Sequence, residues 1–120
     1  MLVVEDNVDA RDMLVYLLRR NGHDVRAAGD GPGAIAEARA FAPHIVLLDL
    51  GLPGADGYAV ARELRASPDT ANAMIVALTG YGQPDDRERV FAAGFDEHLL
   101  KPADPREVLE VVQRERRVTA

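Results

Sequence analysis

The sequence contains no cysteine, no tryptophan and a single lysine, Lys101, among 14 basic residues. The absence of cysteine excludes disulfide bonds, thiolate metal sites, iron–sulfur clusters and cysteine nucleophiles. Apolar runs such as residues 45–48 are far shorter than the roughly 20 residues that cross a bilayer, and no basic segment typical of a signal peptide follows Met1. We therefore expect a cytoplasmic protein without membrane contact.

The remaining composition is that of one ordinary globular domain. The 120 residues are 48% hydrophobic and 28% charged. A chain of this size buries roughly two thirds of the surface that it exposes when unfolded, which is enough for a core. The net charge of -6 would repel phosphate backbones, and the arginines are scattered along the chain. We expect one domain over residues 1–120 that does not itself bind nucleic acid.

Five short apolar segments alternate with five segments of helical periodicity. The helical segments carry apolar residues three or four positions apart, as in Met13, Leu14, Leu17 and Leu18, whereas the short fourth helix has only Val90 and Phe91. This alternation predicts an α/β fold with an open, doubly wound parallel sheet and helices on both faces. The expected strands cover residues 2–4, 24–28, 44–48, 73–78 and 95–100.

Several polar residues are placed to begin these helices. Asn7 or Asp9 can cap the first helix, and Asp56 can cap the third. Asp30 precedes a glycine and a proline at the start of the second helix, and Asp104 begins a capping box before the last one. The predicted helix starts all follow the ends of predicted strands.

The residues at the strand ends carry the chemistry, because doubly wound sheets bind ligands beyond the carboxyl ends of their strands. Three carboxylates gathered at one edge would repel one another unless a cation neutralised them, and carboxylate oxygens are ligands that Mg²⁺ prefers. The sequence therefore predicts a magnesium site that receives a phosphoryl group. The strand ends carry Glu5 and Asp6, then Asp49, Thr79 and Lys101.

Roles for three of these residues follow from charge. Phosphoryl transfer is catalysed by positioning and by countercharge on the phosphoryl oxygens, which Lys101 and the Thr79 hydroxyl can supply together with the metal. One carboxylate must act as the nucleophile and form an aspartyl phosphate. We choose Asp49, because it ends the most apolar strand and enters a glycine-rich loop that a donor can approach.

These residues stand in motifs that resemble the receiver domains of two-component response regulators, the CheY-like proteins. The motifs are residues 4–7 (VEDN), 47–57 (LLDLGLPGADG), 77–80 (ALTG) and 100–102 (LKP), and the likeness covers nearly the whole chain. It implies a flavodoxin-like (βα)5 fold with the strand order 2-1-3-4-5.

The resemblance also implies a set of metal ligands. Asp6 and Asp49 would bind Mg²⁺ directly together with the backbone carbonyl of Gly51, and Glu5 would hold the metal through water. A histidine kinase or a histidine phosphotransfer protein would donate the phosphoryl group to Asp49.

The resemblance further implies how the signal leaves the site. Thr79 and Lys101 would read the phosphoryl group and shift the surface formed by helix 4, strand 5 and helix 5, which is also the expected surface of a homodimer. The resemblance leaves open whether the receiver stands alone or belongs to a hybrid sensor histidine kinase.

Two positions depart from the commonest pattern of the family. His98 stands where the family usually has a tyrosine or phenylalanine that switches rotamer with the threonine. We hypothesise that His98 still swings inward and that its charge makes the output sensitive to pH. Tyr81, two residues after Thr79, is bulky enough to shield the acyl phosphate from water, so we predict that Tyr81→Ala shortens the lifetime of the phosphoryl group.

Other functions fit these residues less well. Residues 29–34 fit a dinucleotide-binding fingerprint, but the preceding strand is too polar to be central, so these glycines more simply begin a helix. A phosphatase of the haloacid dehalogenase type would need a second acid where Gly51 stands, and the three histidines lack the spacing of a zinc site. A docking module that works without phosphorylation stays as the alternative function.

Overall fold

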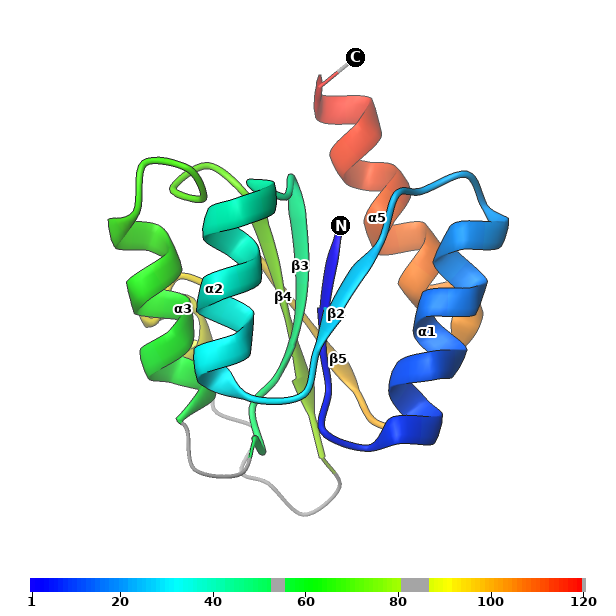
Figure 1. Ribbon diagram of the computed structural model, residues 1–120, viewed down its shortest axis with the longest axis horizontal. Helices are drawn as coiled ribbons and strands as arrows, with labels where there is room; N and C mark the ends of the chain where they lie inside the picture. The colour runs from blue at the N-terminus through cyan, green and yellow to red at the C-terminus, as the bar shows by residue number, and fades with distance from the viewer. Residues whose placement is uncertain (53–55, 81–86, 120) are drawn as a thin grey trace.

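The protein is built around one parallel sheet with helices on both sides, as the computed structural model in Figure 1 shows. The structure describes residues 1–52, 56–80 and 87–119. All neighbouring strands are parallel, and their order is β2-β1-β3-β4-β5. The predicted flavodoxin-like (βα)5 topology is therefore confirmed. The strands are β1 (Leu2–Val4), β2 (Arg26–Ala28), β3 (Ile45–Asp49), β4 (Met74–Thr79) and β5 (Glu97–Leu100).

Two layers of helices cover the sheet. One layer holds α1 and α5, and the other holds α2, α3 and α4 (Figure 1). Within the described ranges, no helix has the length and apolar character needed to cross a membrane. The helices are α1 (Val8–Arg20), α2 (Gly31–Phe41), α3 (Gly57–Ala66), α4 (Arg87–Ala92) and α5 (Pro105–Thr119).

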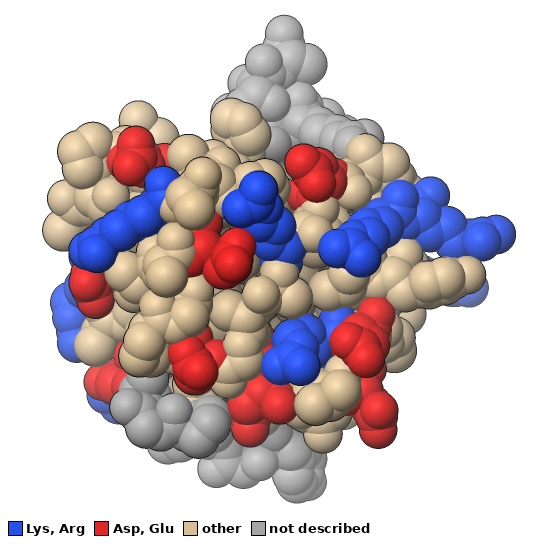
Figure 2. Space-filling model, in the orientation of Figure 1, with Lys and Arg blue, Asp and Glu red and all other residues tan. Residues whose placement is uncertain are grey.

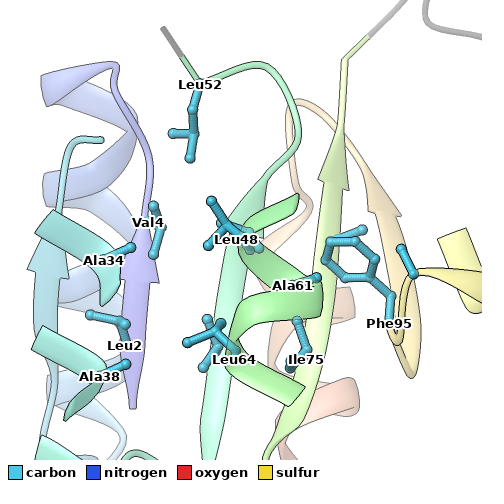
Figure 3. Close-up of a cluster of buried hydrophobic side chains, with 14 of the residues drawn as sticks. Leu2, Val4, Ala34, Ala38, Leu48, Leu52, Ala61, Leu64, Ile75 and Phe95 are labelled. Atoms are coloured by element: carbon cyan, nitrogen blue, oxygen red, sulfur yellow. The ribbon is translucent and has the colours of Figure 1, made fainter. Parts of the chain in front are cut away.

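The continuous apolar runs of the central strands are explained by burial on both faces. In β3, Val46 and Leu48 pack into the core beneath α2 and α3, whereas Ile45 and Leu47 pack into the core beneath α1 and α5. Figure 3 shows the first of these cores, where Leu48 and its neighbours in the sheet meet Ala34 of α2 and Leu64 of α3. A strand between two helical layers needs apolar residues at every position.

The helix starts follow the predicted caps. Asn7, not Asp9, caps α1, since its side-chain oxygen accepts the N–H of Ala10 at 2.9 Å. Gly31 lies in the first turn of α2, as expected if the glycines of residues 29–34 begin a helix. The other predicted caps also accept a backbone N–H from the first turn of their helices: Asp30, Asp56 and Asp104.

Three apolar residues of the predicted helices and strands are exposed. Met13 is 48% exposed because Leu14 and Leu18, one turn apart, take the inner stripe of α1. Phe91 of α4 is 52% exposed, whereas its neighbour Val90 is buried. Leu100, the last residue of the edge strand β5, is 58% exposed because side chains alternate between the two faces of a strand.

Candidate functional site

The register of the sheet brings the predicted strand-end residues together. Val4 of β1 pairs with Leu48 of β3, so the next residues, Glu5 and Asp49, lie level with each other. Lys101 follows β5, and its Nζ lies 2.8 Å from Oδ2 of Asp49 and 3.0 Å from Oε1 of Glu5. Three strands from different parts of the chain thus contribute to one charged cluster at the carboxyl edge of the sheet.

Glu5 is fully buried, which is unusual for a carboxylate. Its Oε1 accepts hydrogen bonds from Lys101 and, at 3.4 Å, from the N–H of Asn7. Its Oε2 also lies 3.0 Å from the Lys101 ammonium, but it has no hydrogen-bond partner among the described residues. Burial raises the pKa of Glu5 above its ordinary value, and the hydrogen bond from Lys101 opposes this only in part.

Asp49 is almost as buried, but its two oxygens are better satisfied. Oδ1 accepts the backbone N–H of Gly51 at 2.8 Å, and Oδ2 accepts the hydrogen bond from Lys101. Burial raises the pKa of Asp49, but the hydrogen bonds from Lys101 and Gly51 outweigh burial and hold it below the ordinary value. Burial likewise lowers the pKa of Lys101, and its bonds to Asp49 and Glu5 outweigh burial and raise it.

The acidic residues are arranged so that they fit a divalent cation. One carboxylate oxygen from each of Glu5, Asp6 and Asp49 lies within 4.8 Å of the other two. Oxygen donors of this kind suit Mg²⁺, and Oε2 of Glu5 is a buried acceptor that a metal-bound water could satisfy. Gly51 adjoins the cluster through its N–H, while the metal contact expected of its carbonyl stays a prediction.

Thr79 lies at the end of β4, but its hydroxyl faces β5 instead of the carboxylates. The hydroxyl donates to the carbonyl of Leu99 at 3.3 Å, and the N–H of Lys101 donates to the carbonyl of Thr79 at 2.7 Å. His98 is half-buried in β5, opposite Ala77 of β4. Tyr81, predicted to shield the site, lies outside the described residues.

Two residues beside the cluster were not predicted from the sequence. Arg11 of α1 donates from Nη1 to the carbonyl of Glu5 at 3.2 Å. Gly57 begins α3 so close to the loop after β3 that a Cβ there would lie 2.7 Å from Cα of Leu50 and 3.1 Å from the carbonyl oxygen of Asp49. Arg11 sits in an ordinary helical segment that gave no signal, whereas Gly57 ends the motif of residues 47–57, which did not indicate this close contact.

The fold and the cluster at the carboxyl ends of its strands define a doubly wound α/β domain with an acidic site that could hold a metal ion. The chain belongs to the response regulator receiver domain family, whose family model matches residues 1–113. It is thus a receiver domain of two-component signalling.

Known proteins of three kinds resemble it. The chain is 37% identical over 113 residues to the DNA-binding response regulator MtrA of Mycobacterium tuberculosis, covering 94% of this chain but only 48% of MtrA. The solved structure of the chemotaxis response regulator CheY4 of Vibrio cholerae matches with a TM-score of 0.87 at 27% identity, covering 95% of each chain. A receiver domain of a signal transduction histidine kinase from Syntrophus aciditrophicus matches with a TM-score of 0.84 at 27% identity, covering 95% of this chain and 86% of that one.

Proposed function

We propose that this domain is a Mg²⁺-dependent phosphoacceptor in which Asp49 receives a phosphoryl group from a phosphohistidine. The observation that carries the proposal is the arrangement around Asp49: a buried carboxylate bonded to Lys101, with the oxygens of Glu5 and Asp6 within metal-binding distance of it. Because its pKa is lowered, Asp49 is ionised at neutral pH and is ready to act as a nucleophile.

The transfer itself needs little more than position and charge. A carboxylate oxygen of Asp49 forms a bond to phosphorus while the bond between phosphorus and the donor imidazole nitrogen breaks, and the electron pair returns to the imidazole. When bound, Mg²⁺ supplies positive charge to the phosphoryl oxygens. Asp6 and Asp49 would hold the ion directly, with the carbonyl of Gly51, and Glu5 would hold it through water. Lys101, which is bonded to Asp49, would neutralise part of the remaining charge.

Thr79 connects this site to the edge strand. To donate to a phosphoryl oxygen on Asp49, its hydroxyl must leave the carbonyl of Leu99, which belongs to β5. That exchange of partners would remove the hydrogen bond to the carbonyl of Leu99, the residue that follows His98 in β5. We extend the proposal to an inward swing of His98 that carries the change to the surface of α4, β5 and α5, with a dependence on pH that follows from the imidazole.

The same surface supports a contact with a second copy of the chain. Phe91 of α4 and Leu100 of β5 are exposed there, and a groove of about 800 Å³ passes between Phe91, Met74 and Arg114 of α5. Exposed apolar side chains beside a groove are typical of surfaces that bind another protein. Homodimerisation through α4, β5 and α5 is part of the proposal.

The expected partner is a histidine kinase or a histidine phosphotransfer protein, acting in the cytoplasm. Contact of this domain with nucleic acid or membrane is not part of the proposed function. Figure 2 supports this for the face that it shows, where basic side chains are interspersed with acidic ones and several acidic side chains lie in the lower half of the view. Shielding of the phosphoryl group by Tyr81 likewise stays a prediction.

Phosphoramidate tests the proposal because it presents the same phosphorus–nitrogen bond as a phosphohistidine. The protein is incubated with phosphoramidate and Mg²⁺ and then separated by phosphate-affinity electrophoresis. We expect a retarded band that needs Mg²⁺ and is absent from Asp49→Asn. A wild-type protein that binds Mg²⁺ yet shows no retarded band would favour the docking module.

A further inference from the structure

The two peptide units that flank the Cα of Glu5 are each held by a hydrogen bond. The N–H of Glu5 donates to the carbonyl of Ala28 in β2 at 3.1 Å, and the carbonyl of Glu5 accepts the hydrogen bond from Nη1 of Arg11 at 3.2 Å. That carbonyl and the N–H of Asp6 belong to the same planar peptide unit. Its orientation therefore sets the directions in which the two acidic side chains leave the backbone.

Arg11 reaches this carbonyl from the end of the first turn of α1, across the turn that joins β1 to α1 (Figure 1). The contact ties the helix to the segment that presents both acidic side chains. Arg11 is half-buried, so its guanidinium is held against the protein and is not free in solvent. A hydrogen bond from a charged donor is stronger than one between neutral groups.

Gly29 makes the space that the guanidinium occupies. A Cβ at position 29 would lie 2.7 Å from Nη1 of Arg11 and 4.0 Å from the carbonyl oxygen of Glu5. The backbone of Gly29 is not in the left-handed region, so its conformation does not require glycine. The small residue is needed there for the close approach of Arg11.

From this geometry we propose that Arg11 is a positioning residue for the acidic site and that Gly29 is the residue that lets it act. Arg11 fixes the Glu5–Asp6 peptide so that both carboxylates are directed toward a divalent cation. The inference rests on the proposed Mg²⁺-dependent function. It concerns a residue that touches neither the metal nor the phosphoryl group.

The sign of the effect distinguishes positioning from simple electrostatics. Arg11 is a cation bonded to the backbone of the segment that presents Glu5 and Asp6, so its removal should strengthen Mg²⁺ binding if only charge matters. If Arg11 orients the ligands, its removal weakens binding instead, because contacts that orient metal ligands commonly carry about tenfold or more in affinity. Arg62, exposed on α3, provides the matched control because Arg62→Met makes the same change in net charge.

The test uses the metal-free protein and Mg²⁺ alone, followed by calorimetry and by NMR. We expect Arg11→Met to bind Mg²⁺ about tenfold more weakly, Gly29→Ala to show a smaller loss, and Arg11→Lys to recover most of the affinity. In the absence of metal, ¹⁵N relaxation of the Asp6 amide should show greater motion in Arg11→Met than in wild type or Arg62→Met.

The proposal is overturned if Arg11→Met binds Mg²⁺ as tightly as Arg62→Met or more tightly. If the wild-type protein binds no Mg²⁺, the proposed function fails, but the relaxation measurement still decides the role of Arg11. An Asp6 amide equally ordered in Arg11→Met and in wild type then contradicts the positioning role. A lower thermal stability of Arg11→Met with unchanged affinity and unchanged order marks Arg11 as a structural residue only.

Discussion

Lys101 donates a 2.8 Å hydrogen bond to Asp49, and this contact joins the edge strand β5 to the buried centre of the sheet. The same ammonium bonds Glu5, so one cation serves two buried carboxylates. Removing a cation from such a group leaves like charges side by side without compensation. The stability of the site and, in the proposed function, its chemistry therefore depend on the same lysine.

Replacing Lys101 by methionine tests this dependence. We expect the free energy of unfolding at pH 7 to fall by about 2–3 kcal/mol, because Glu5 and Asp49 lose their shared partner. Phosphorylation by phosphoramidate should be lost as well. Urea denaturation measures the first effect and phosphate-affinity electrophoresis the second, and unchanged stability at pH 7 would contradict the buried triad.

The contribution of the Lys101–Asp49 pair should have a defined range of pH. The pKa of Asp49 is lower in the folded protein than in the unfolded chain, so this stabilisation is present above the unfolded value and is lost as the pH falls through the folded one. The pKa of Lys101 is raised, so its stabilisation is present below the unfolded value and is lost as the pH rises through the folded one. Hence the difference in stability between wild type and Lys101→Met should shrink in strong acid and in strong alkali. A difference that stays constant with pH would refute the pairing.

Glu5 is predicted to favour metal binding at a cost in stability. Its pKa is raised by burial, so its ionised form destabilises the metal-free protein at neutral pH. We expect Glu5→Gln to raise the free energy of unfolding without metal by about 1 kcal/mol and to weaken Mg²⁺ binding. Glu110→Gln, at an exposed position of α5, is the matched control and should change neither quantity. A destabilised Glu5→Gln would contradict this interpretation.

Gly57 is predicted to be required for the loop that follows Asp49. The Cβ of an alanine would lie 2.7 Å from Cα of Leu50, which is backbone and cannot move without displacing the loop. We expect Gly57→Ala to lower the free energy of unfolding by about 1–3 kcal/mol and to slow phosphorylation of Asp49. Thermal unfolding and the rate of phosphorylation check these effects, and a variant with wild-type values in both would show that the loop tolerates the shift.

Arg65 should act on stability alone, because its contacts lie near the amino ends of β4 and β5, whereas the acidic cluster lies at the carboxyl ends of the strands. It donates to the carbonyls of Ala71, Ala73 and Gly94 and pairs with Asp96 at 2.6 Å. We expect Arg65→Met to lower the free energy of unfolding by about 2 kcal/mol and to leave Mg²⁺ affinity unchanged. A loss of Mg²⁺ affinity in the folded variant would show a coupling between the two ends of the strands that the contacts do not predict.

The sequence predicted the fold and the residues of the cluster because both depend on local patterns. Apolar runs ended abruptly in charged or polar residues, and parallel strands place such ends at one edge of the sheet. The shared bonds of Lys101 were not predictable, because they depend on the side-chain path from β5 across the sheet to Glu5. The exposure of Met13 and the contact of Arg11 with the carbonyl of Glu5 were missed for a similar reason: each depends on which neighbour occupies the space beside it.

The central claim is that Asp49 accepts a phosphoryl group with the help of a bound metal. Intact-mass spectrometry after incubation with acetyl phosphate and Mg²⁺ tests it most directly, with Asp49→Asn and a metal-free sample alongside. We predict one phosphoryl adduct on the wild-type protein, removed by hydroxylamine and absent from both controls. An adduct that persists in Asp49→Asn, or a wild-type protein that binds Mg²⁺ but gains no mass, would contradict the claim.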